Sequence, residues 1–167
     1  MIRLCLGLVV AGTVLTGATG PAAASQISGR ISYSLTHLSD VKIVQKNETF
    51  VLSRDMLSGT IAASVPGSAL DKSKQVCIGA TLVDAAGKTI EGHGSCDSVD
   101  ADGDVWWLVY SAKGPSKSRW IVVGGTGKYK HLRGTGTTSF LQQLQGVQAR
   151  QQTWEQAYDG EMTGLPK

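Results

Sequence analysis

The 167-residue chain carries little charge and no dense run of one sign. Only 17% of its residues are charged, and 16 Lys and Arg against 13 Asp and Glu give a net charge of +3. A nucleic-acid-binding protein would show a clustered basic stripe, so the scattered charge argues against a nucleic-acid partner. Intrinsic disorder requires low hydrophobicity with high net charge, whereas 41% of these residues are hydrophobic. The length fits one folded domain.

Motifs for nucleotide binding, nucleophilic catalysis and metal binding are missing. A phosphate-binding loop would need Ser or Thr after Gly127-Lys128 and a glycine five residues before Gly127, where the chain has Tyr129 and Val122. No G-x-S-x-G occurs, and zinc-ligand spacing is absent from the three histidines, which are His37, His93 and His131. The sequence therefore predicts no cofactor and no metal site.

The one long apolar run lies at the N-terminus. Arg3 precedes the apolar residues 4–15, and small residues then lead to Ala22–Ala24, which has the A-x-A form of a cleavage site. The run is shorter than the ~20 residues needed to span a bilayer. Residues 1–24 are therefore predicted to be a cleaved signal peptide, and residues 25–167 the mature domain. We expect an exported protein, periplasmic or secreted, with no membrane span in its mature form.

Cysteine is scarce. Cys5 belongs to the expected signal peptide, which leaves Cys77 and Cys96 in the mature chain. An even pair in an exported protein favours a disulfide over two free thiols. If residues 75–98 form a hairpin that turns at 86–87, the two cysteines face each other. Facing Cα atoms of an antiparallel pair lie ~4.5–5.5 Å apart, which is within reach of a disulfide.

Proline is scarce as well, with four residues, whereas glycine is abundant, with 21. Gly-rich turns separate short segments rich in Val, Ile, Thr, Tyr and Trp, and no domain linker interrupts them. This pattern is typical of an antiparallel barrel or sandwich. Residues 141–152 fit a helix, a loop or a strand. The expected strands are 27–34, 49–52, 59–65, 75–83, 89–98, 105–112, 120–123, 134–141 and 153–163.

Two residues of the expected hairpin are candidate catalytic groups. The register that pairs Val83 with Ile90 places Glu91 and His93 on one face, opposite to the face with the cysteines. If that face lines a barrel lumen, an acid and a base two residues apart can act on a ligand. If it faces outward, they form an ordinary solvated pair, which is the commoner case. Glycines on the cysteine face suggest either the close approach of another element or strong curvature of the barrel.

Three carboxylates lie close together in the sequence, at Asp100, Asp102 and Asp104. Carboxylate oxygens can bind Ca²⁺, but an EF-hand needs glycine at the sixth loop position, and here Gly103 is the fourth residue. A polar hairpin turn, closed by Asp and Gly, is the favoured interpretation.

The segment WIVVGGTGKYKHLRGTGT, residues 120–137, resembles the signature of the allene oxide cyclase-like and dirigent-like β-barrel superfamily, which has exported bacterial members. In that superfamily a strand ends in a Gly-Gly-Thr-Gly turn, and an aromatic residue, here Tyr129, follows two residues later. The resemblance covers about residues 75–163 and implies a small barrel with a lumen. The resemblance assigns no catalytic residue of the superfamily to this chain, because the matching segment is a structural turn. Glycines that permit a sharp reversal form this turn: Gly124, Gly125 and Gly127.

The predicted fold class is all-β, a single antiparallel barrel of about eight strands. The leading function is non-catalytic binding of a small apolar or amphipathic ligand, or of a protein partner. One alternative is a lumenal cyclase or isomerase acting on an oxidised lipid or phenolic, with Glu91 and His93 as weak candidates. Another is a structural envelope protein with a filled barrel. The sequence identifies no ligand-binding residues, and the resemblance implies a possible homo-oligomer.

Overall fold

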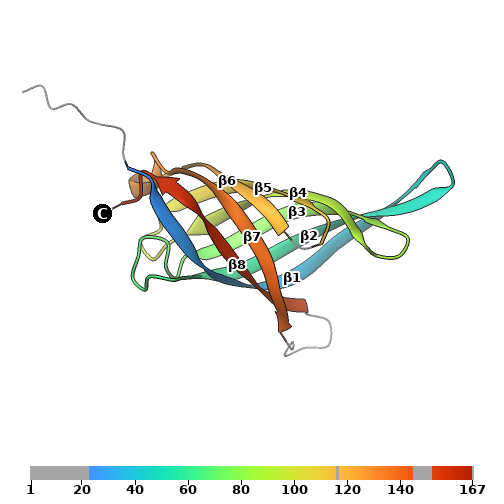
Figure 1. The fold of residues 1–167 in the computed structure, drawn as a ribbon, viewed down its shortest axis with the longest axis horizontal. Helices are drawn as coiled ribbons and strands as arrows, with labels where there is room; N and C mark the ends of the chain where they lie inside the picture. The colour runs from blue at the N-terminus through green and yellow to red at the C-terminus, as the bar shows by residue number, and fades with distance from the viewer. Residues whose placement is uncertain (1–22, 116, 145–151, 167) are drawn as a thin grey trace, which may run out of the picture.

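The computed structural model describes residues 23–115, 117–144 and 152–166, and there the chain forms one closed barrel (Figure 1). Each strand pairs antiparallel with the next along the chain, and β8 closes the barrel against β1. The all-β, eight-stranded antiparallel barrel predicted from the sequence is confirmed. Its strands are β1 (Ser25–Gln45), β2 (Glu48–Ala63), β3 (Lys74–Asp84), β4 (Thr89–Val99), β5 (Val105–Lys113), β6 (Lys117–Gly125), β7 (Arg133–Leu144) and β8 (Gln152–Thr163).

The connections give the barrel a closed end and an open end. The β2–β3, β4–β5 and β6–β7 connections meet at the closed end, and the last of them contains the short 3-10 helix η1 (Gly127–Tyr129). Tyr129 and Leu132 from this connection are fully buried, and Leu70 from the β2–β3 connection is 3% exposed. The β1–β2 hairpin projects beyond the barrel at the other end (Figure 1). In the described residues, the core therefore continues under the closed end of the barrel.

Strands β1 and β2 are longer than the sequence indicated. β1 continues well past the expected 27–34, and the expected segments 49–52 and 59–65 belong to the single strand β2. A two-residue turn at Lys46 and Asn47, with φ of 50° and 67°, joins them. Positive φ at both positions matches the twist of the flanking strands, as in a type I′ hairpin. The polar stretches within both strands broke the apolar alternation and concealed this long hairpin.

The β3–β4 hairpin has the predicted register over most of its length. Cys77 pairs with Cys96, and the two form a disulfide, as predicted. Nearer the turn the register shifts by one, so Val83 faces Thr89 and the predicted pairing with Ile90 is wrong. Ile90 is the extra residue of a β-bulge and is 40% exposed.

The glycines beside the cysteines make room for an aromatic ring. A Cβ added at Gly79 or Gly94 would collide with the hydroxyl of Tyr110 on β5. Cys77 and Cys96, on the same face, are 1% and 4% exposed. The predicted close approach is therefore confirmed, and this face is the inner one.

Residues 1–22, where most of the signal peptide is expected, lie outside the described residues. The segment 141–152, for which the sequence did not decide between helix, loop and strand, is described only in part. Its residues 145–151 lie outside the described residues, and Leu141–Leu144 continue β7. Among the described residues, no helix has the length and apolar character needed to cross a bilayer.

Candidate functional site

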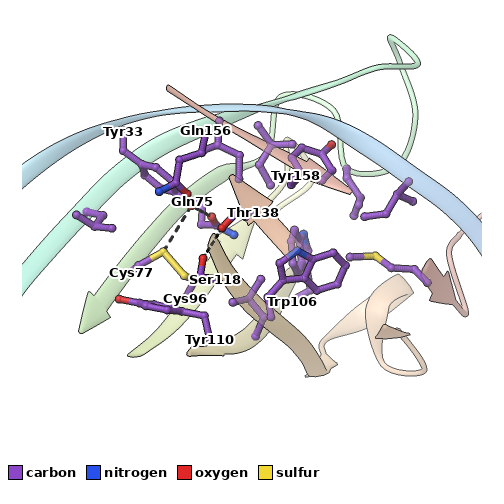
Figure 2. A pocket seen from close by; sticks show the side chains of 18 residues that line it. Tyr33, Gln75, Cys77, Cys96, Trp106, Tyr110, Ser118, Thr138, Gln156 and Tyr158 are labelled. Carbon is purple, nitrogen blue, oxygen red and sulfur yellow. Dashed lines mark hydrogen bonds between the residues drawn. A yellow bond between two sulfur atoms is a disulfide. The ribbon is translucent and has the colours of Figure 1, made fainter. Parts of the chain in front are cut away.

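The barrel encloses a cavity that opens at the end from which the β1–β2 hairpin projects. Its inner part, the lumen, has a volume of about 90 Å³ and is lined mainly by apolar and aromatic side chains (Figure 2). Its outer part, the mouth, has a volume of about 330 Å³. Five residues line both parts and form the neck between them: Leu57, Tyr110, Ser118, Thr138 and Gln156. A small molecule can thus approach from solvent and place an apolar group inside the barrel.

The polar side chains deep in the lumen wall bind one another. Tyr33 Oη donates to Gln75 Oε1, and Gln75 Nε2 donates to Ser98 Oγ at 2.8 Å. These residues are at most 5% exposed. Burial, with a smaller contribution from Tyr110, raises the pKa of Tyr33, so its phenol stays neutral. No charged residue lines the lumen among the residues that the structure describes. The lumen therefore suits an uncharged guest.

The neck joins this neutral lumen to a charged mouth. Ser118 Oγ and Thr138 Oγ1 hydrogen-bond to each other across β6 and β7 (Figure 2). Tyr110 lines both the lumen and the mouth. Burial raises the pKa of Tyr110, and the carboxylate of Asp55 raises it further. The charge of Asp55 therefore acts on the neck through Tyr110.

Four polar side chains of the β1–β2 hairpin gather at the mouth. His37 Nδ1 lies 3.0 Å from Asp55 Oδ1, and His37 Nε2 lies 3.5 Å from Asp40 Oδ2. Ser53 Oγ donates to Asp55 Oδ2 at 3.2 Å. Asp55 itself lines the mouth. We call these four residues the mouth cluster; its histidine and carboxylates can exchange protons with a bound molecule that reaches Asp55.

A β-bulge assembles the mouth cluster. His37 pairs with Asp55, Leu38 has no partner in the ladder, and Asp40 pairs with Ser53. In a regular strand, residues three apart point to opposite faces, so His37 and Asp40 would be separated. The extra residue returns both to one face. Sequence reasoning missed this cluster, because the only signal is the His-x-x-Asp spacing, which brings the two side chains together only where the strand is bulged.

We predict that His37 titrates above the ordinary histidine pKa of about 6.5. The hydrogen bond to Asp55 raises its pKa most, partial desolvation lowers it, and the charges of Asp40 and Asp55 raise it. A raised pKa means that protonated His37 stabilises the folded state below the unfolded-state pKa, and that this stabilisation is lost as the pH rises through the folded-state pKa. An NMR titration of the imidazole measures it.

Two neighbouring substitutions provide the control for this titration. Asp55→Asn should return the His37 pKa toward its ordinary value, and Asp40→Asn should lower it less, because Asp40 lies farther from the ring. A His37 pKa at or below the ordinary value in the unmodified protein would contradict the cluster as described.

The candidate catalytic pair Glu91 and His93 lies on the outer face. Their side chains are 51% and 67% exposed, and His93 Nε2 lies 4.0 Å from Glu91 Oε2. Neither residue lines the lumen or the mouth. Glu91 and His93 are therefore a solvated pair on the outer face, which was the alternative expectation. A catalytic role in the lumen required them to lie on the inner face.

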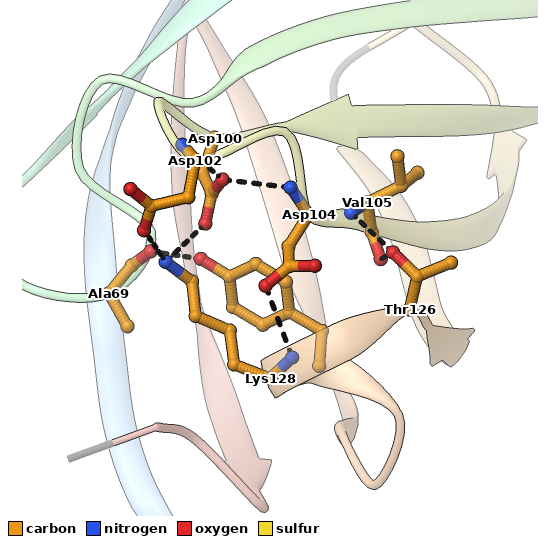
Figure 3. A network of polar contacts seen from close by, with 8 residues as sticks. Ala69, Asp100, Asp102, Asp104, Val105, Thr126 and Lys128 are labelled. Atoms are coloured by element: carbon orange, nitrogen blue, oxygen red, sulfur yellow. Dashed lines mark hydrogen bonds and ion pairs between the residues drawn. The ribbon is translucent and has the colours of Figure 1, made fainter.

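The three carboxylates at the closed end hold a turn together (Figure 3). Asp100 Oδ1 accepts hydrogen bonds from the backbone N–H groups of Asp102 and Asp104, at 2.9 and 3.1 Å. Lys128 Nζ lies 2.6 Å from Asp100 Oδ2 and 2.5 Å from Asp102 Oδ2. Burial acts to raise the pKa of Asp100, but Lys128 and the backbone donors outweigh it and hold that pKa below its usual range. These contacts are those of the predicted polar turn.

The three glycines of the Gly-Gly-Thr-Gly segment have different roles. Gly127 has a φ of 46°, and a Cβ there would collide with the carboxylate of Asp104. Gly125 ends β6 without a positive φ, and a Cβ there would collide with Tyr129. Gly124 also lies in β6, beside the ring of Trp107, where a Cβ would come within 3.2 Å. The reversal itself therefore needs only Gly127, and Gly125 serves close packing.

Comparisons with known proteins give likenesses of fold. No family model matches the sequence, and no curated protein matches it. Two solved pterocarpan synthase dirigent proteins are similar. One is 14% identical, with a TM-score of 0.45 over 88% of this chain and 94% of its own. The other is 13% identical, with a TM-score of 0.49 over 89% and 99%.

A solved pyocyanin demethylase is also similar, with 18% identity and a TM-score of 0.39 over 80% of this chain and 99% of its own. Two of these three structures are dirigent proteins, the group that the Gly-Gly-Thr-Gly segment resembles. At TM-scores below 0.5 these are similarities only, and they bring no function to this chain.

Proposed function

We propose that the barrel binds a small, neutral, largely apolar molecule, with its apolar part in the lumen and a polar part at the mouth. The observation that carries this proposal is the pair of adjoining cavities that share the neck residues, the inner one apolar and uncharged and the outer one more polar, with Asp55 and Lys117 in its wall. Such a gradient suits an amphipathic guest, because the apolar part gains from burial while the polar part keeps its hydrogen bonds.

The interior is only partly filled by side chains, which favours a ligand over the alternative of a purely structural barrel. Engineered apolar cavities of about 150 Å³ bind molecules as small as benzene. Lumen and mouth together exceed that size, at about 90 and 330 Å³. The lumen alone is smaller than that, so a matching ligand places one ring or a short acyl chain in the lumen and extends its remainder into the mouth.

Binding without chemistry is the function that the lumen supports best. Tyr33 and Gln75 of its wall are neutral and bind one another, and no charged side chain lines the lumen among the described residues, which leaves no acid–base pair there to face an apolar guest. A lumenal cyclase or isomerase would have to use the mouth cluster, since Glu91 and His93 point outward.

Two consecutive threonines of β7 provide the test. Thr138 lines the neck, whereas its neighbour Thr137 bonds through its hydroxyl to Asp159 outside the barrel. Thr138→Phe should fill the neck and weaken binding of the neutral fluorophore N-phenyl-1-naphthylamine about tenfold or more, and Thr137→Phe should change it less than twofold. Fluorescence titration measures both affinities. Equal affinities in the two variants would contradict binding inside the barrel.

Export is the second part of the proposal. It is supported by the N-terminal sequence pattern and by the disulfide, since disulfides persist in oxidising compartments. N-terminal sequencing of the protein from its own source should begin at Ser25 or Gln26, and a chain that begins at Met1 would contradict it.

A further inference from the structure

Two buried polar atoms of the lumen wall have no hydrogen-bond partner among the described residues. They are Trp106 Nε1 and Tyr158 Oη, on residues that are 2% and 6% exposed. Both residues line the lumen (Figure 2). A second lumen tryptophan shows the ordinary arrangement: Trp120 Nε1 donates to the backbone carbonyl of Thr137 at 3.1 Å. Trp106 is thus the lumen tryptophan whose N–H group is left for a guest.

The chemistry of the indole defines what the guest must carry. An indole N–H can only donate, so its partner must be a hydrogen-bond acceptor. Within the lumen wall, Gln75 Oε1 already accepts from Tyr33, whereas Tyr158 Oη has no partner among the described residues and can donate as well as accept. An anionic acceptor does not fit, because no cationic side chain lines the lumen in the described residues and a buried charge without a partner is costly.

We propose that Trp106 Nε1 donates to a neutral carbonyl oxygen at the buried end of the lumen ligand. The proposed ligand is therefore an apolar molecule whose buried end carries the oxygen of a ketone, aldehyde, ester or quinone. A carbonyl oxygen needs only donors, and both unpartnered atoms of the lumen wall, Trp106 Nε1 and Tyr158 Oη, can donate. This inference rests on the proposed function, because it names the chemistry of the same lumen.

Acetophenone and ethylbenzene are a suitable probe pair, because they share a ring and differ in the carbonyl oxygen. In protein with ¹⁵N-labelled indoles, acetophenone should move the Nε1–H proton signal of Trp106 downfield, and ethylbenzene should not. Trp106→Phe keeps an aromatic ring, removes the donor and assigns the signal. It should weaken acetophenone binding about five- to tenfold and change ethylbenzene binding less than twofold.

Trp120→Phe is the matched control, because it removes an indole that already has an acceptor. It should leave the ratio of the two probe affinities unchanged. If both probes bind but Trp106→Phe weakens them equally, or the downfield shift is absent, the carbonyl inference is overturned while lumen binding stands. If neither probe binds the unmodified protein, the proposed function falls as well. Should Trp106→Phe fail to fold, the signal of the unmodified protein still decides, with Trp107→Phe, Trp120→Phe and Trp154→Phe assigning the Trp106 signal by elimination.

Discussion

Replacing Tyr129 by alanine should lower the free energy of unfolding by about 3–5 kcal/mol, the range observed when a buried aromatic side chain is removed. Tyr129 is completely buried at the closed end. Its hydroxyl donates to the backbone carbonyl of Ala69 at 2.5 Å, which ties the β6–β7 connection to the β2–β3 connection (Figure 3). The alanine variant loses the ring and this tie together, and urea denaturation monitored by tryptophan fluorescence measures the loss.

Tyr129→Phe separates the two contributions. It keeps the ring and removes only the hydroxyl, so it should cost about 1–2 kcal/mol, mostly from the carbonyl left without its donor. If Tyr129→Ala lowered the free energy of unfolding by less than the about 1–2 kcal/mol expected for Tyr129→Phe, the closed end would not depend on this side chain. The aromatic position two residues after the Gly-Gly-Thr-Gly segment would then have no structural role in closing the barrel.

Loss of the disulfide should have the second largest effect. Cys77 and Cys96 are 19 residues apart, and a loop of that length corresponds to about 3 kcal/mol in the chain-entropy model. The double variant Cys77→Ala with Cys96→Ala should lose about that free energy of unfolding, with a further loss from the small cavity that the two sulfurs leave in the lumen wall. Urea denaturation again provides the measurement.

A reducing agent supplies the control for the disulfide. It should destabilise the unmodified protein by a similar amount and leave the double variant unchanged. Equal stability with and without reductant in the unmodified protein would show that the bond contributes nothing. Two free thiols found in the denatured, unreduced protein would show that it does not form.

The sequence was most informative where local rules determine the structure. The 75–98 hairpin could be aligned because one turn and two cysteines define an antiparallel register, and Cys77 does face Cys96. The predicted register was wrong close to the turn, where Ile90 is the extra residue of a bulge. A bulge of one residue could not be predicted, because it changes neither the composition nor the alternation of the strand. The sequence also left open which hairpin face is the inner one, because this depends on how the barrel closes.

The candidate site was much less predictable. The mouth cluster joins residues of β1 and β2 through a bulge at Leu38, in a stretch whose polar residues gave no strand signal. Trp106 was visible as an aromatic residue, but only the packed barrel shows that its N–H group lacks an acceptor among the described residues. Both features depend on contacts between strands, and such contacts are set by the closed barrel rather than by local propensity.

The guest is proposed to lie inside the barrel, and the apolar outer surface is the alternative location. Exposed apolar side chains lie on the outer faces of β3, β5 and β6, at Ile78, Val109 and Ile121. The lumen wall has its own methyl groups, at Ile31 and Ile61.

Intermolecular nuclear Overhauser effects between N-phenyl-1-naphthylamine and assigned methyl groups are the most direct test of where the guest lies. We expect contacts from the probe to Ile31 and Ile61, and none to Ile78 or Ile121. Contacts confined to the outer residues would contradict this expectation.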